Sequence, residues 1–106
     1  KATSNRRRAE KPDEIEDSRL RRQYGLSLKA FNKLVEEQDN LCLICQRPET
    51  MIWRGKKTPK KLTVDHDHKT GAIRGLLCHK CNMMLGLAED QILTLLRGAD
   101  YLRGLL

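Results

Sequence analysis

The sequence has few aromatic residues and lacks any long apolar run. Only 4% of its 106 residues are aromatic. Apolar runs such as 76–78 and 83–85 are far shorter than the roughly 20 residues that a membrane helix needs. No apolar stretch follows the basic start of the chain, so we expect no secretory signal. These absences argue against a transmembrane protein, and a chain of this length has room for one small core.

Acidic residues are also in the minority. The chain holds 21 Lys and Arg against 14 Asp and Glu, a formal net charge of +7. An excess of positive charge favours a polyanionic partner, and we expect DNA bound largely through its phosphates. A solvated basic surface without a partner is the alternative. The candidate DNA contacts are Arg6, Arg7, Arg8, Arg54, Lys56, Lys57, Lys60, Lys61 and Arg74. For Arg74, a role in packing or in an ion pair with Asp65 or Asp67 is an equal alternative.

Four cysteines stand out against this composition. They form two pairs, Cys42 with Cys45 and Cys78 with Cys81, each with two residues between them. Two disulfides would suit a secreted domain, but paired cysteines at this spacing are typical of a tetrahedral zinc site. A small core benefits from such a staple, so we predict a structural zinc ion held by all four. We expect His79 to be exposed or to contact DNA rather than to bind this metal.

The apolar pattern predicts helices at both ends of the chain and a hairpin between them. A first helix runs from Pro12 to about Arg22 and stops at Gly25, and a second begins after the N-cap Ser27 and ends near 39–40. Residues 47–61 form a loop. A strand that begins at 62–64 and a returning strand at 72–77 flank a turn at 69–71, and helices follow at 82–87 and from about 89. We expect a small α+β fold, in which a zinc-stapled ββα-metal finger is flanked by N- and C-terminal helices. Residues 1–11 would be a basic arm and 12–106 a single domain.

The C-terminal third is rich in apolar residues. We expect Met83 and Met84 to lie in the core, together with a stripe on the last helix. That stripe consists of Ile92, Leu95, Leu96, Ala99, Leu102 and Leu106. Leu105 and Leu106 exceed what a small core requires, which leaves a homodimer interface open.

The segment with the most chemistry is Asp65-His66-Asp67-His68. Side chains alternate along an extended strand, so the two carboxylates face one way and the two imidazoles the other. A polar, solvated strand end is the alternative. Because the segment lies between the cysteine pairs and Asn82 follows the second pair, we expect carboxylate, imidazole and amide to converge in a short ββα unit.

Such a group suits metal-assisted hydrolysis of phosphodiester bonds. A Mg²⁺-class ion prefers a few protein oxygens and keeps several waters. Asp65 and Asn82 supply one charged and one neutral oxygen. A neutral imidazole accepts the proton of an attacking water, while the metal stabilises charge on the phosphate and the leaving oxygen.

These residues also carry a family resemblance. The motifs are Cys42-x-x-Cys45, Val64-Asp65-His66-Asp67-His68, Gly71-x-Ile73-Arg74-Gly75-Leu76-Leu77-Cys78 and Cys81-Asn82-x-x-Leu85-Gly86. In this order they resemble the phage recombination endonuclease VII group, which belongs to the HNH, or His-Me finger, nucleases. The resemblance spans about Arg19 to Tyr101.

The resemblance implies a role for each matching residue. Asp65 matches the carboxylate that binds the catalytic Mg²⁺ or Mn²⁺, His66 the general base, and Asn82 the amide ligand of the same ion. His68 matches a second active-site histidine that contacts or orients the phosphate. The junction-resolving phage enzyme continues into a longer C-terminal portion and works as an intertwined dimer, whereas this sequence ends at Leu106. Catalysis is therefore a firmer expectation than junction specificity.

Two functions from different classes remain. The first, which we favour, is a metal-dependent DNA endonuclease that nicks or cuts both strands, with branched DNA among its candidate substrates. The second is a non-catalytic, zinc-stapled DNA-binding module. A binding module explains the cysteines and the charge, but it has no need of Asp65, His66 and Asn82 together. We expect the protein to act inside the cell, in the cytoplasm of a bacterial host if a phage encodes it.

Overall fold

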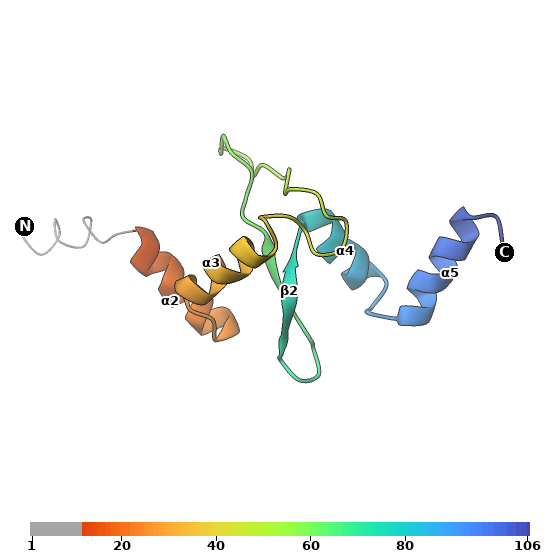
Figure 1. The fold of residues 1–106 in the computed structure, drawn as a ribbon, viewed down its shortest axis with the longest axis horizontal. Coiled ribbons are helices and arrows are strands. Elements are labelled where there is room, and N and C mark those ends of the chain that lie inside the picture. Colours follow the sequence, from red (N-terminus) through yellow and green to blue (C-terminus); the bar gives the residue numbers. More distant parts are fainter. Residues whose placement is uncertain (1–11) are drawn as a thin grey trace, which may run out of the picture. The chain divides into compact units, whose positions relative to one another are not determined.

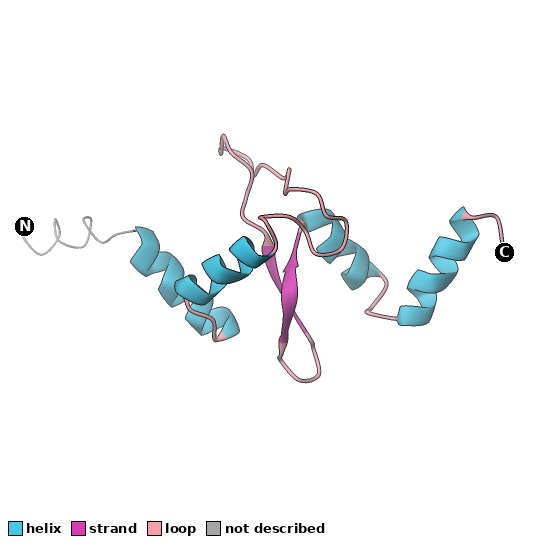
Figure 2. Cartoon of the chain, viewed as in Figure 1, coloured by secondary structure: helices cyan, strands magenta, loops and turns pink. Residues whose placement is uncertain are grey.

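The computed structural model describes residues 12–106, which form four helices and one two-stranded sheet (Figure 1 and Figure 2). In chain order these are α2 (Pro12–Tyr24), α3 (Leu28–Glu37), β1 (Thr63–His66), β2 (Ile73–Leu77), α4 (His79–Leu87) and α5 (Ile92–Leu102). The expected small α+β fold is confirmed. Arg6, Arg7 and Arg8, which were expected to contact DNA, lie outside the described residues.

The chain divides into two compact units. One unit, here called the hairpin unit, consists of residues up to Asn40 together with Val64–Leu76. The other, here called the cysteine unit, consists of Leu41–Thr63 together with Leu77–Leu106. The cysteine unit therefore holds both cysteine pairs, and the hairpin unit holds most of the two strands.

Helices α2 and α3 of the hairpin unit begin and end where their sequences favour it. Acidic residues lie in the first turn of α2 and basic residues in its last turn, an order that suits the helix dipole. Gly25 follows α2 with φ of +68°, a conformation that glycine adopts without strain. Ser27 then caps α3, because its side chain accepts a hydrogen bond from the Ala30 N–H at 3.0 Å.

The hairpin is formed by β1 and β2, which lie side by side (Figure 1). The Asp67 carboxylate shapes the turn between them by accepting hydrogen bonds from the N–H groups of Lys69 at 2.7 Å and Thr70 at 3.0 Å. Gln38, at the end of α3, exchanges two hydrogen bonds of 3.0 Å with the backbone of Leu76. A side-chain amide thus bonds to β2 as a neighbouring strand would.

The hydrophobic core of the hairpin unit is small. Leu20, Phe31, Val64 and Leu76 are exposed by 5% or less. They come from α2, α3, β1 and β2 respectively, so each element contributes one buried apolar side chain to this unit. This core contains no cysteine and fixes the strand that carries Asp65 and His66.

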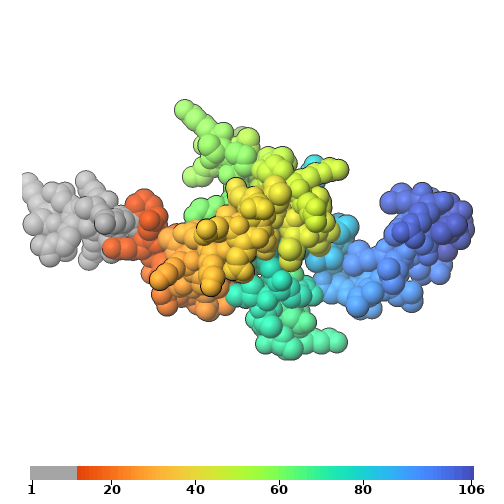
Figure 3. Space-filling view, in the orientation of Figure 1, coloured from red at the N-terminus to blue at the C-terminus, as the bar shows by residue number. Residues whose placement is uncertain are grey.

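Helix α4 of the cysteine unit begins at His79, three residues earlier than the sequence predicts. Cys78 is the reason, because its sulfur acts as the N-cap and accepts a hydrogen bond from the Cys81 N–H at 3.4 Å. Residues 47–61 form a loop, as expected. Figure 3 shows the green part of this loop projecting from the surface.

The expected core position of the C-terminal apolar residues is wrong. Met83 and Met84 are 48% and 42% exposed, and α5 contains no buried residue. Ile92 and Leu102 of the expected stripe are 74% and 86% exposed. The physical reason is that the described chain offers α5 no layer to pack against beyond a shallow groove that Leu95 shares with α4. Among the described residues, no helix is long and apolar enough to span a membrane.

Candidate functional site

The four cysteines come together in the cysteine unit. The sulfurs of Cys42, Cys45, Cys78 and Cys81 all lie within 4.8 Å of one another, and none of them forms a disulfide. A tetrahedral ion with metal–sulfur bonds of about 2.3 Å needs sulfurs about 3.8 Å apart. The Sγ atoms of Cys45 and Cys78 are 3.8 Å apart. The cluster therefore fits a single tetrahedral metal ion.

Electrostatics point the same way. Burial opposes ionisation of Cys42, but backbone N–H groups of Cys78, Cys45 and Ile44 lower its pKa to about 6. Burial and the neighbouring sulfurs of the other three cysteines raise the pKa of Cys81 to about 12. Ionisation of one thiol is thus favoured. Ionisation of a second thiol is opposed by the negative charge of the first unless a cation binds between them. A divalent ion supplies the positive charge that four thiolates require.

Backbone hydrogen bonds shape the first cysteine pair into a tight turn. The Gln46 N–H donates to the Cys42 carbonyl at 2.9 Å, and the Cys42 N–H donates to the Arg47 carbonyl at 2.9 Å. Gln46 adopts φ of +59° to make this turn. The resulting knuckle directs Cys42 and Cys45 to one point, as the Cys-x-x-Cys spacing predicts.

In the hairpin unit, Asp65 is a buried carboxylate on β1, only 8% exposed. Arg74 on β2 holds both of its oxygens: Nε lies 2.7 Å from Oδ2 and Nη2 lies 3.1 Å from Oδ1. Of the two carboxylates that the sequence offered to Arg74, Asp65 thus forms a two-pronged ion pair with it. Asp67 instead bonds the turn, whose N–H groups hold its pKa below the usual range.

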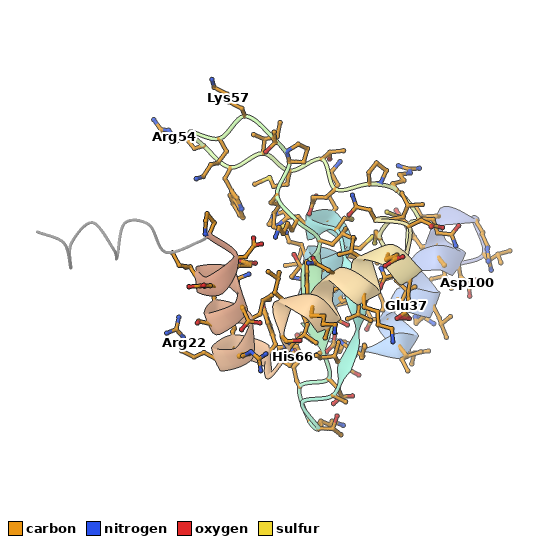
Figure 4. All side chains as sticks on the ribbon, turned by 60° about the vertical axis from the view of Figure 1, so that its left-hand side comes forward. Arg22, Glu37, Arg54, Lys57, His66 and Asp100 are labelled. Atoms are coloured by element: carbon orange, nitrogen blue, oxygen red, sulfur yellow. The ribbon has the colours of Figure 1, made fainter. Side chains whose placement is uncertain are left out.

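The two histidines of the segment lie next to each other. The ring centroids of His66 and His68 are 5.1 Å apart, and the Tyr24 ring of α2 lies 6.1 Å from that of His66. Figure 4 shows His66 on the hairpin. The strand alternation therefore places both imidazoles on one side and the buried carboxylate of Asp65 on the other. Asn82 lies on α4, in the cysteine unit, and its role as a metal ligand stays a prediction.

The structure distinguishes among the predicted DNA contacts. Arg54, Lys56 and Lys57 are exposed, and Figure 4 shows Arg54 and Lys57 at the outer end of their loop. Lys60 differs, because its side chain is only 17% exposed and its ammonium lies 3.4 Å from Glu49. It also donates to the Lys61 carbonyl at 2.6 Å. Lys60 is therefore an internal cation, and Arg74 is engaged by Asp65.

Two residues of this arrangement escape sequence analysis. Glu49 accepts a hydrogen bond from the His79 N–H at 2.8 Å across 30 positions of sequence, and Gln38 bonds Leu76 across 38 positions. Their partners are backbone groups, which leave no residue-type signal in the sequence. The only signal for Glu49 is its isolation as the last acid before a basic stretch.

The fold and the site define a small α+β protein with a cluster of four cysteines that can hold a metal ion and a strand that carries Asp65 and His66. A family model described as recombination endonuclease VII matches residues 17–104. The chain belongs to this family, which confirms the resemblance seen in its motifs.

Relatives of similar sequence are phage proteins. The gene 59 protein of Mycobacterium phage D29 is 46% identical over 88 residues, covering 82% of this chain and 49% of the relative. The gene 59 protein of Mycobacterium phage L5 is 44% identical over 87 residues, covering 81% of this chain and 49% of the relative. The chain thus spans about half the length of these curated relatives. No solved structure matches it.

Proposed function

We propose that this chain is a metal-dependent DNA endonuclease that hydrolyses phosphodiester bonds. The observation that carries the proposal is the strand β1, on which a buried carboxylate, Asp65, is followed directly by His66. Membership of the recombination endonuclease VII family supports DNA as the substrate. The proposal includes the HNH type of active site and both nicking and double-strand cleavage, with branched DNA among the substrates to be tested.

The residues of the hairpin unit suit a hydrolytic role. Asp65 is kept in place by the Arg74 guanidinium, and we propose it as a ligand of Mg²⁺ or Mn²⁺ together with Asn82. When bound, such an ion stabilises negative charge on the phosphate and the leaving oxygen. The unprotonated ring nitrogen of His66 takes the proton of the attacking water. His68, with its ring 5.1 Å from that of His66, orients the phosphate.

We also propose that the four-cysteine cluster holds zinc with a structural role. Four sulfurs close the coordination sphere of a tetrahedral ion, which leaves no position open for substrate. Zinc then shapes the cysteine unit, and the second divalent ion takes part in hydrolysis.

The proposal includes a homodimer that acts inside the host bacterium of a phage. The exposed apolar residues of the last helix, such as Leu96 and Leu102, suit a second copy of the chain. Light scattering of the purified protein should give twice the mass of one chain. A mass of 12.2 kDa would contradict the dimer.

The direct test uses supercoiled plasmid and a synthetic four-way junction, each with Mg²⁺ or Mn²⁺. We expect open-circle or linear plasmid from the wild-type protein and none from Asp65→Asn. The matched control is Asp100→Asn, which removes a carboxylate from an exposed ion pair on α5 and should leave cleavage unchanged. Binding of plasmid and junction without cleavage by the wild type would favour the non-catalytic DNA-binding module instead.

A further inference from the structure

The segment 51–60, here called the basic loop, is a closed structure rather than a slack connection. At its base the Lys60 N–H donates to the Met51 carbonyl at 2.8 Å. At its tip the Lys56 N–H donates to the Trp53 carbonyl at 2.9 Å, and Gly55 has φ of +85°. A positive φ at this position is typical of a type II β-turn, which favours glycine. The basic loop therefore has a defined base and a defined tip.

Glu49 attaches the base of the basic loop to the start of α4. Its side chain is only 6% exposed. Oε2 accepts the N–H groups of Thr50 at 3.0 Å and Met51 at 3.1 Å, and Oε1 accepts the His79 N–H at 2.8 Å. Burial raises the pKa of Glu49, but the N–H groups of Met51 and His79 and the Lys60 ammonium hold it below its usual range. Because His79 directly follows Cys78, one carboxylate joins the basic loop to the four-cysteine cluster.

The cations of the segment separate into an internal one and an outer group. Lys60 donates to Thr63 Oγ1 at 2.7 Å as well as lying near Glu49, so its charge is used within the fold. Arg54, Lys56 and Lys57 are exposed around the tip (Figure 4). No acidic residue occurs between Glu49 and Asp65. The tip thus presents three positive charges without a neighbouring carboxylate in sequence.

Trp53 forms a second attachment. Its ring meets that of His79 edge-on, with centroids 5.6 Å apart and planes at 80°, a favourable aromatic geometry. The ring is still 47% exposed. Since the sequence contains one tryptophan, its fluorescence reports on the basic loop alone.

We propose that the basic loop is a preformed DNA-gripping element, in which Arg54, Lys56 and Lys57 contact phosphates and Glu49 is the residue that positions them. The inference rests on the proposed function, because it takes DNA as the polyanion. A preformed loop loses little conformational entropy on binding, and phosphate contacts fix the register of a protein on DNA. The basic loop therefore contributes to DNA affinity and not to the chemical step.

Salt dependence of DNA binding tests the three cations. We would measure the affinity for a fluorescent duplex by anisotropy over a range of KCl, without divalent ions. The test variant carries Arg54→Gln, Lys56→Gln and Lys57→Gln. Its slope of log K against log salt should be less negative by about 0.9 for each phosphate that is no longer neutralised, about 2.7 in all. The control Lys29→Gln, Lys33→Gln, Arg97→Gln removes the same charge from the net +7 at exposed helix positions. It should change the slope far less.

The outcomes separate this inference from the proposed function. Equal slopes for the two triple variants would overturn the role of the basic loop, and plasmid cleavage by the wild type would still support the nuclease. A slope reduced only in the basic-loop variant, without cleavage of plasmid or junction by the wild type, would support the basic loop and contradict the nuclease. Absence of any DNA binding by the wild type would overturn both.

Glu49→Ala and Glu49→Gln test the positioning role. Alanine removes the carboxylate that the base of the basic loop bonds to, so acrylamide quenching of Trp53 should rise and DNA affinity should fall. Glutamine keeps an oxygen that accepts hydrogen bonds from the backbone N–H groups. Glu49→Gln should therefore show quenching and DNA affinity between those of Glu49→Ala and the wild type. Wild-type quenching and affinity in Glu49→Ala would overturn the role. If Glu49→Ala does not fold, Glu49→Gln decides. Wild-type quenching and DNA affinity in Glu49→Gln would overturn the need for the carboxylate, whereas a partial loss of DNA affinity with increased quenching would support it.

Discussion

At the scale of single residues, two buried carboxylates organise the molecule. The side chains of Asp65 and Glu49 are 10% and 6% exposed, and each lies beside a cation, Arg74 and Lys60 respectively. A carboxylate taken out of water is tolerated only where charge and hydrogen bonds replace the lost solvation. The ion pair with Arg74 therefore fixes the position of Asp65 in the candidate active site.

The Asp65–Arg74 pair gives a residue-scale prediction about stability. Arg74→Gln leaves the buried carboxylate without its guanidinium, which should lower the free energy of unfolding by about 1–3 kcal/mol. Arg74→Lys keeps the charge but not the two-pronged geometry. Its free energy of unfolding should therefore lie between those of the wild type and Arg74→Gln. Urea unfolding of the metal-loaded protein measures both. Arg97→Gln, at an exposed position of α5, is the control, and a decrease no larger in Arg74→Gln than in this control would contradict the account.

Sequence analysis reached some of these residues and missed others for a physical reason. The clustering of the four cysteines was predictable because metal ligands have few substitutes and fixed spacings. The catalytic role of Asp65 and His66 stays a prediction. The ion pair of Arg74 was one of two alternatives, since a strand pattern does not fix which carboxylate lies across the hairpin. Glu49 and Lys60 were not predictable as a pair, because their positions depend on how the basic loop closes.

At the scale of elements, α3 shows how a helix start is fixed by two side chains. Ser27 accepts the Ala30 N–H, and Asp17 of α2 accepts the Leu28 N–H at 2.8 Å. The first N–H groups of a helix lack partners within the helix, so both bonds stabilise α3. The Asp17 bond also fixes α2 against α3, which together supply Leu20 and Phe31 to the core.

Asp17 gives the element-scale prediction, which concerns pH. The Leu28 N–H, and next Arg21, hold the pKa of Asp17 below its ordinary value of 3.8. Its contribution to stability is therefore fully present above pH 3.8 and is lost as pH falls through the lower folded value. NMR titration of the Asp17 carboxyl carbon should give a midpoint below 3.8. A midpoint at or above that value would contradict the helix-start assignment.

Element boundaries were predictable where local chemistry sets them. Gly25 and Ser27 mark the end of α2 and the start of α3 in the sequence as in the structure. The start of α4 was placed too late, because a cysteine that is both candidate ligand and N-cap does not resemble the usual oxygen caps. The closing hydrogen bonds of the basic loop were also missed, since they join backbone groups.

At the scale of the whole molecule, the chain consists of two compact units with different means of stabilisation. The hairpin unit has an apolar core drawn from four elements, whereas the hydrophobic core of the cysteine unit consists of three of its cysteines with Leu62 and Leu77. The sequence overestimated the core, because an apolar helix stripe does not show whether a partner layer exists. Helix α5 leaves that stripe exposed.

The cysteine unit gives the prediction at this scale. Structural zinc contributes about 10–16 kcal/mol in small peptides, as much as the whole stability of an ordinary domain. Removal of the metal by a chelator, or Cys42→Ser, should therefore unfold the cysteine unit. Thermal unfolding followed by circular dichroism, with zinc content measured in parallel, tests this. Metal-free protein with an unchanged unfolding temperature would contradict the zinc assignment.

The central claim is that His66 serves as general base in DNA cleavage. The most direct measurement is the single-turnover rate of plasmid cleavage by His66→Ala with Mg²⁺ or Mn²⁺, with DNA affinity measured on the same preparation. The account predicts a rate lower by roughly 10²- to 10⁴-fold, with folding, zinc content and DNA affinity retained. A wild-type cleavage rate in this variant would contradict it.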